Sequence, residues 1–323
     1  MLVNQPSVVA FTENGTKSRK KILAMGAEAK EMIGRAPPGV SVVSPIEGGV
    51  VSDFESAEML LHRLVKEVYG NEHLLKTHAV LCVPPQTTEL DQSIFQEVAE
   101  LANLGKVYLI EESMAAALGA GLPVQAARGN MVVDIGGGTT DVAVISLGGI
   151  VCCESIRIAG KLFDEKIIEY IRSSRNITIG AQTAENVKIA IGTTEPKHSG
   201  EIIPIKGQDT RDGLPKTFEI SEAEIYEAIR GPIEEIIKAV RRVLEETPPE
   251  LSSDILESGI TLVGGGALLK NLDQTLSRET GVPVLVAEDP LLAVAAGGGK
   301  VLENLKELGG LLRKTSKSRL RAR

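Results

Sequence analysis

The sequence contains no tryptophan and has little aromatic character of any kind. Aromatic residues make up 3% of the 323 residues, and the formal net charge is −8. Proteins that bind single-stranded nucleic acid stack its bases on aromatic side chains, and general nucleic-acid binders are basic. We therefore expect no nucleic acid among the partners of this chain.

Cysteine and histidine are also scarce. The cysteines are Cys82, Cys152 and Cys153, and an odd number does not make a disulfide framework. Neighbouring residues of a strand point to opposite faces, so the adjacent pair does not easily form a bridge. The four histidines show no metal-ligand spacing. This usage is typical of a protein in a reducing cytoplasm.

Long hydrophobic runs are missing as well. No run reaches the roughly 18 apolar residues of a transmembrane helix, and the N-terminus lacks the charged start and apolar stretch of a signal peptide. A hydrophobic fraction of 43% and a charged fraction of 24% are typical of a folded protein, long enough here for two lobes. Residues 313–323 differ, with six positive side chains and no acid. This tail is either a solvated, disordered end or a segment attracted to an anionic membrane or an acidic partner.

Strands and helices alternate along the first half of the chain. Residues 57–68 keep apolar side chains at helical spacing, whereas residues 79–83 and 107–110 are continuous apolar runs typical of buried strands. Residues 131–158 contain three apolar strands joined by short glycine turns, which predicts an antiparallel meander. The alternation predicts an α/β fold with a mixed sheet.

The second half contains longer helical patterns. Ser221 stands three residues before Glu224, the spacing of a capping box, so we expect a long helix to begin there and to end at the Pro248-Pro249 pair. The strand at residues 260–263 is expected to lead through glycines into a helix from Ala267. Residues 290–312 read as mostly helical, with an interruption at the glycines of residues 297–299.

The first of two glycine loops carries the most specific chemical signal. It reads Asp134-Ile135-Gly136-Gly137-Gly138-Thr139-Thr140-Asp141 and directly follows a buried strand. Glycines let backbone N–H groups approach phosphate oxygens, the two threonines add hydroxyl donors, and Asp134 is placed to hold Mg²⁺ through water. A hairpin turn without a ligand is the alternative, but three glycines exceed what a two-residue turn requires.

The second loop, residues 263–268, joins a strand to the helix expected from Ala267. A helix N-terminus at this place can face a nucleotide, although loops of this kind are common and the signal alone is weak. The chain has neither the GK[ST] of a Walker loop nor the GxGxxG of a dinucleotide-binding fold.

Two such loops, roughly 130 residues apart, are the pattern of the actin, chaperone and sugar-kinase superfamily. A closer resemblance is to MreB, the bacterial actin family, in residues 110–123, 131–149, 248–251, 264–272 and 281–290. The likeness runs from about Val3 to Leu305. It implies an actin-like (ribonuclease H-like) two-lobed ATPase fold in which each lobe carries a small subdomain.

The resemblance also implies a division of the chain. Lobe I would comprise a core and a small subdomain, lobe II likewise, and a basic tail would follow. These parts are residues 1–11, 44–126 and 298–312 for the core of lobe I, residues 12–43 for its small subdomain, residues 127–160 and 222–297 for the core of lobe II, residues 161–221 for its small subdomain, and residues 313–323 for the tail.

The site residues follow from the same resemblance, with ATP and Mg²⁺ as the implied cofactors. The residues implied to bind the nucleotide are Asp134, Gly136, Gly137, Gly138, Thr139 and Thr140 at the phosphates, Gly160, Glu185 and Lys188 toward the ribose and base, and Gly265, Gly266, Ala267 and Leu268 over the adenosine. Glu112 is implied to orient the attacking water with Thr139 as its partner, a role that suits a carboxylate. The alternative for Glu112 is a carboxylate that caps a helix.

The sequence departs from the family in three places. Asp141 stands where many members have Glu, and Lys161 replaces the usual acid after Gly160, which changes the charge near the nucleotide. The family opens with a hairpin that carries a first phosphate loop of the form DLGTAN, whereas this chain begins with residues that match the strand after it. We expect either that Met1 is an internal residue of a longer product or that the chain is a short form with impaired ATP handling, because each buried unpaired backbone group costs about 1–3 kcal/mol.

The function implied by the resemblance is that of an ATP-dependent filament that organises cell shape and wall synthesis. Its partners would be copies of itself and wall-synthesis proteins at the cytoplasmic face of the inner membrane, and its enzymatic activity a weak ATPase coupled to polymerisation. A filament that positions organelles, a phosphotransferase and a chaperone ATPase stay open as alternatives. Leu74 and Leu75 fit a membrane contact, or they pack against the neighbouring helix.

Overall fold

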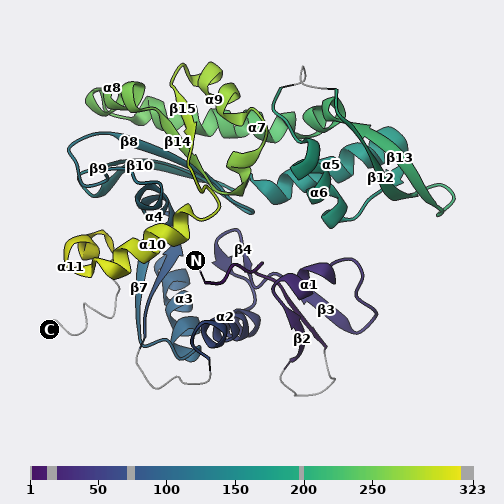
Figure 1. Ribbon diagram of the computed structural model, residues 1–323, viewed down its shortest axis with the longest axis horizontal. Coiled ribbons are helices and arrows are strands. Elements are labelled where there is room, and N and C mark those ends of the chain that lie inside the picture. The colour runs from purple at the N-terminus through teal and green to yellow at the C-terminus, as the bar shows by residue number, and fades with distance from the viewer. Residues whose placement is uncertain (1, 13–19, 71–76, 196–199, 314–323) are drawn as a thin grey trace. The chain divides into compact units, whose positions relative to one another are not determined.

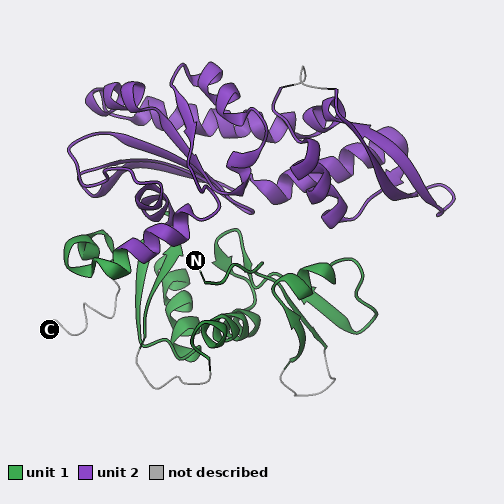
Figure 2. Ribbon diagram, viewed as in Figure 1, with its two compact units in different colours: residues 1–110, 301–323 green, residues 111–300 purple. Residues whose placement is uncertain are grey.

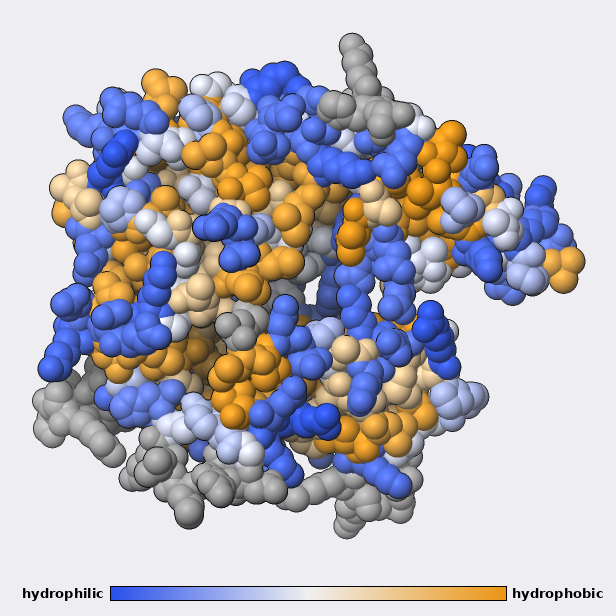
Figure 3. All heavy atoms as spheres, viewed as in Figure 1, coloured by the Kyte–Doolittle hydropathy of each residue, from blue (hydrophilic) through white to orange (hydrophobic). Residues whose placement is uncertain are grey.

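The computed structural model describes residues 2–12, 20–70, 77–195 and 200–313. The chain forms two compact units, one made of residues 1–110 and 301–323 and the other of residues 111–300 (Figure 2). Leu74 and Leu75, and the basic tail after Arg313, lie outside the described residues. On the face seen in Figure 3, hydrophilic and hydrophobic side chains are interspersed, in keeping with a charged fraction of 24%.

In its described residues, unit 1 contains three small sheets and the helices that pack on them (Figure 1). Strand β1 (Val9–Thr12) pairs antiparallel with both β2 (Lys21–Met25) and β3 (Val40–Val43). Its other elements are α1 (Ala27–Glu31), β4 (Ile46–Glu47), β5 (Val50–Val51), α2 (Phe54–Tyr69), β6 (His78–Val83), α3 (Glu89–Leu101), β7 (Lys106–Glu111), α11 (Leu305–Leu308) and the 3₁₀ turn η2 (Gly309–Leu311). Strand β6 pairs with β7 in a two-stranded sheet.

The two longest helices of unit 1 in the described residues, α2 and α3, begin at side-chain caps. Asp53 accepts a hydrogen bond from the backbone N–H of Ser56 at 3.1 Å, which starts α2. Lys20 pairs with the same carboxylate. Thr88 and Asp91 form a capping box that starts α3. The apolar spacing at residues 57–68 predicted the first helix correctly, because that face is buried against the sheet.

Unit 2 is built on a five-stranded sheet in the order β10-β9-β8-β14-β15. Strands β8 (Asn130–Ile135), β9 (Thr140–Ser146) and β10 (Gly149–Ile156) form the predicted antiparallel meander. Strand β14 (Ile260–Val263) lies parallel to β8 on one side and to β15 (Val284–Val286) on the other. Their side chains join those of α5 (Gly160–Arg175) and α7 (Glu222–Glu246) in one large apolar core.

Unit 2 contains further helices and strands outside the central sheet. They are α4 (Glu112–Gly119), β11 (Ile177–Thr178), α6 (Ala181–Ile191), β12 (Ile202–Asp209), β13 (Pro215–Ser221), α8 (Pro249–Ser258), the 3₁₀ turn η1 (Gly265–Leu268), α9 (Leu272–Thr280) and α10 (Ala293–Glu303). The capping box of Ser221 and Glu224 starts α7 as predicted, and α7 ends just before Pro248. In the part of the chain that the structure describes, no helix combines the length and the apolar character needed to cross a membrane.

The prediction of an α-helix from Ala267 was wrong. The chain instead makes one 3₁₀ turn over Gly265–Leu268 and passes through Asn271, whose φ is 63°, before α9 begins at Leu272. The physical reason is close packing, since a Cβ on Gly266 would overlap the side chain of Ile135. The loop is held against the end of β8 rather than turning away as a helix.

The predicted interruption at residues 297–299 was also wrong, because α10 runs through these glycines without a break. A Cβ on Gly297 would overlap the backbone oxygen of Ala115 in α4, and one on Gly119 would overlap that of Ala293. The glycines therefore let α4 and α10 cross at backbone distance. Lys300 donates a hydrogen bond to the oxygen of Leu118 at 2.8 Å and so caps the end of α4.

This crossing predicts an asymmetry between two glycines of α10. Gly297→Ala should destabilise the chain by about 1–3 kcal/mol, because the new Cβ would overlap the backbone oxygen of Ala115 in α4. Gly299→Ala is the matched control, since a Cβ there meets nothing within 4 Å. It should be neutral or stabilise by up to about 1 kcal/mol, because alanine is the better helix former. Urea unfolding followed by circular dichroism measures both, and equal effects of the two substitutions would contradict the close crossing.

Candidate functional site

The first glycine loop is the turn between β8 and β9. Asp134 and Asp141 lie directly opposite each other in the register of these strands, and so do Ile135 and Thr140. The backbone N–H of Gly136 donates to the oxygen of Thr139 at 2.9 Å and closes the turn. Because cross-strand partners project to the same face, the two aspartates share one side of the sheet.

Three carboxylates share this place, because Glu112 at the start of α4 is close enough to interact with both aspartates. Burial, and then repulsion by Asp141 and Asp134, raises the pKa of Glu112 to about 8. Burial and repulsion by Asp141 raise the pKa of Asp134 to about 7. Burial also raises the pKa of Asp141, although hydrogen bonds from Ser155 and Thr139 oppose the shift. The cluster therefore favours binding a proton or a cation, because either one reduces its negative charge.

Asp141 has one oxygen with a partner and one without. The hydroxyl of Thr139 donates to Oδ2 at 3.1 Å, whereas Oδ1 is buried and accepts no hydrogen bond within the described structure. An unpaired buried carboxylate oxygen fits a site that takes up a cation or its bound water. In the described residues, no group of three or more acidic, histidine or cysteine side chains is arranged to hold a metal ion directly.

The N-terminus of α5 is bound to the same loop. The N–H of Gly160 donates to the oxygen of Gly136 at 3.1 Å, and that of Lys161 donates to the oxygen of Gly137 at 2.8 Å. Thr140 donates its hydroxyl to the oxygen of Ile158 at 2.6 Å. The first turn of α5 contains no acid. The positive end of a helix dipole therefore adjoins the glycine loop, as in anion-binding sites.

Lys188 of α6 extends this connection. Its ammonium donates to the oxygen of Gly160 at 2.9 Å and pairs with Asp164 at 2.8 Å. Glu185 lies one helical turn earlier on α6 and is half-buried. The structure thus brings Lys188, Gly160 and the first glycine loop together.

The second glycine loop meets the end of β8 from the other side. Gly264 has a φ of 81°, and a Cβ there would overlap an oxygen of Asp134 and the backbone of Ile135. Gly265 and Leu268 are exposed and Ala267 is buried. Both glycine loops therefore border Asp134, and all of the predicted site residues lie in unit 2.

Two residues of the site escaped sequence reasoning. Asp164 pairs with Lys188, and Ser155 faces Asp141 across the meander. Gly264, which makes room for Asp134, belongs to the predicted second loop but was not among the predicted site residues. Asp164 stands four residues after Gly160, which places both on one face of a helix, so a helical-spacing search around the glycine could have found it. Ser155 follows from the register of the meander once its turn is fixed.

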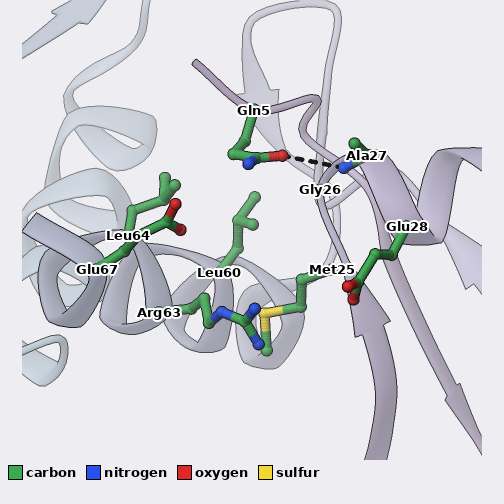
Figure 4. Close-up of a pocket in the computed structure, with 9 residues that line it drawn as sticks. All are labelled: Gln5, Met25, Gly26, Ala27, Glu28, Leu60, Arg63, Leu64 and Glu67. Carbon is green, nitrogen blue, oxygen red and sulfur yellow. Dashed lines mark hydrogen bonds between the residues drawn. The ribbon is translucent and has the colours of Figure 1, made fainter. Parts of the chain in front are cut away.

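A separate small pocket occurs in unit 1 (Figure 4). Its volume is about 100 Å³, and its lining includes Leu60 and Leu64 of α2 with the charged groups of Glu28, Arg63 and Glu67. Gln5 crosses its rim and accepts a hydrogen bond from the N–H of Ala27 at 3.0 Å. None of the predicted site residues lines this pocket, and it is small for a nucleotide.

Known proteins resemble this chain over nearly its whole length. Residues 1–310 match the model of a protein family described as MreB/Mbl protein. The cell shape-determining protein MreB of Escherichia coli strain K12 is 47% identical over 311 residues, which cover 96% of this chain and 90% of that protein.

Solved structures are also similar to this chain. The crystal structure of MreB5 of Spiroplasma citri bound to ADP has a TM-score of 0.89 at 37% identity, covering 95% of this chain and 91% of that one. A MamK double helical filament has a TM-score of 0.77 at 21% identity, covering 92% of this chain and 91% of that one. At so low an identity, the second likeness shows the fold alone.

The raised pKa of Glu112 predicts a pH dependence of stability. From the ordinary value of 4.5 up to about 8, the folded chain binds more protons at this group than the unfolded chain does. The free energy of unfolding therefore falls as the pH rises through this window. Glu112→Gln removes that contribution, so the variant should lose less stability across the window than the wild type. Urea unfolding at a series of pH values measures this, and identical slopes would rule out a raised pKa for this group.

Proposed function

This chain belongs to the MreB/Mbl protein family, and we propose that it is an ATP-dependent, filament-forming bacterial actin homologue that organises cell shape and wall synthesis. One observation supports the proposed nucleotide site above all others. Two glycine loops, far apart in the sequence, border Asp134 at the end of β8, with the N-terminus of α5 bound to the first of them. Its work would be done at the cytoplasmic face of the inner membrane.

The residues around β8 suit a nucleotide with its Mg²⁺. Gly137, Gly138 and Thr139 would receive the phosphates, and a Cβ on Gly137 meets nothing within 4 Å, so the loop has open space there. Asp134 would hold Mg²⁺ through water, and the ion would neutralise charge on the phosphates. The ADP bound to MreB5 of Spiroplasma citri supports this assignment.

The second loop and α6 would complete the nucleotide site. Gly265, Gly266, Ala267 and Leu268 would cover the adenosine, with the exposed side chain of Leu268 offering apolar surface to it. Glu185 and Lys188 of α6 would lie on the side of the ribose and base. Residues 161–221 would then form the small subdomain of lobe II, within the two-lobed division expected from the sequence.

Glu112 and Thr139 would act on the attacking water. A base must lose its proton before it accepts another, and a pKa of about 8 keeps most of Glu112 protonated at neutral pH. Positive charge at the site would lower that pKa, so the carboxylate would become competent only when the site is loaded. This fits a weak ATPase whose turnover follows assembly.

Gly137→Ala tests the nucleotide site without disturbing the fold. The methyl group has room within the chain but would occupy the space of a phosphate, so affinity for Mg-ATP should fall at least about tenfold, or roughly 1.4 kcal/mol. ATP-dependent pelleting should fall with it. Gly180→Ala is the matched control, since its Cβ also meets nothing within 4 Å. Unchanged binding by Gly137→Ala would place the phosphates elsewhere, and absence of ATP-dependent polymer in the wild type would refute the filament.

Membrane association is a separate part of the proposal. Leu74 and Leu75 lie outside the described residues, between α2 and β6. Their replacement by serine should abolish sedimentation with liposomes, because in this proposal the two leucines insert into the membrane and supply the apolar contact. Leu256→Ser is a control, since this leucine is 57% exposed on α8 in unit 2. Wild-type sedimentation of the double variant would refute the contact.

A further inference from the structure

The ammonium of Lys188 is almost withdrawn from water. Its side chain is 15% exposed and that of Asp164 is 14% exposed. A cation in such a place is costly unless it is paired, and here Asp164 forms an ion pair with it at 2.8 Å while the oxygen of Gly160 accepts a hydrogen bond from it. Space beside Gly160 is tight, since a Cβ there would come within 3.3 Å of the ammonium and 3.4 Å of the oxygen of Gly136.

Gly160 passes this restraint on to the glycine loop. It donates its N–H to the oxygen of Gly136, and Lys161 donates to the oxygen of Gly137. In a trans peptide the carbonyl and the following N–H point in opposite directions. Two carbonyls fixed toward α5 therefore direct the N–H groups of Gly137 and Gly138 away from it. These are the N–H groups that the proposed function assigns to the phosphates.

We propose that Lys188 is a positioning residue for the phosphate loop, held in place by Asp164, and acts through Gly160 rather than chiefly through the ribose or base. The inference rests on the proposed function, since it concerns the same nucleotide site. By fixing the peptide planes at Gly136 and Gly137 before any ligand arrives, Lys188 lowers the conformational cost of binding phosphate. Asp164 keeps the ammonium over Gly160 and balances its charge.

The positioning role makes a prediction that a direct contact does not. In Lys188→Met, affinity for ADP should fall about tenfold, whereas affinity for adenosine should stay unchanged, because adenosine has no phosphate to be received. A direct contact with the ribose or base would weaken both ligands equally. Lys166→Met is the matched control, since Lys166 on α5 pairs with Glu169 at the exposed surface.

Amide exchange tests the same idea in the nucleotide-free chain. The N–H groups of Gly160 and Lys161 should exchange about tenfold faster in Lys188→Met, and the control should leave them unchanged. Asp164→Asn should accelerate them less, because the bond from Lys188 to Gly160 remains. Lys188→Met leaves the charge of Asp164 unpaired and could fold poorly for that reason. In that case both measurements are made on the double variant Lys188→Met with Asp164→Asn, which lacks that charge.

The outcomes are separable. Unchanged exchange, or equal loss of ADP and adenosine affinity, would overturn the positioning role even if the chain binds nucleotide. Failure of the wild type to bind ADP would count against the proposed function, and the exchange measurement would still report on the contact of Lys188 with Gly160.

Discussion

Three carboxyl groups buried together at the end of β8 are the constraint on which the site depends. Glu112, Asp134 and Asp141 belong to three segments of unit 2, and repulsion from Asp141 adds to burial in raising the pKa of both Glu112 and Asp134. A folded chain tolerates such a cluster in its ionised form only where a nearby positive charge compensates it. The N-terminus of α5 and the ammonium of Lys188 are fixed on the neighbouring side, and a loaded nucleotide site would bring Mg²⁺. The cluster is therefore understandable as part of a binding site and costly as a purely structural feature.

Close backbone approach is the second requirement, and glycine meets it at several points. Gly264 and Gly266 allow the second loop to lie against Asp134 and Ile135. Gly160 leaves space between Lys188 and the first loop, and Gly137 leaves space on the side where phosphate would bind. At Gly119 and Gly297 the same property serves helix packing, where α4 carries Glu112 at its first residue. Glycine thus determines both the shape of the site and the seating of the helix that supplies its carboxylate.

Much of this arrangement could be predicted from the sequence, because strong local signals agreed with tertiary packing. The meander of β8, β9 and β10 follows from apolar runs separated by glycine turns, and α7 follows from its capping box. The family resemblance gave the actin-like fold and assigned a set of residues that the structure gathers in unit 2. The errors arose where tertiary contacts outweighed local propensity. Glycines at 297–299 read as a break because nothing in the sequence shows that Ala115 lies against them, and the helix expected from Ala267 gives way to packing on Ile135. Asp164 was missed because its role is to pair with Lys188, which is distant in sequence.

The most direct test is a crystal structure of this chain grown with ADP and Mg²⁺. The account predicts phosphate density at the N–H groups of Gly137 and Gly138, the adenosine against Gly265–Leu268, and Lys188 still bound to Gly160. Nucleotide bound away from both glycine loops, for instance at the unit 1 pocket beside Gln5, would contradict the account.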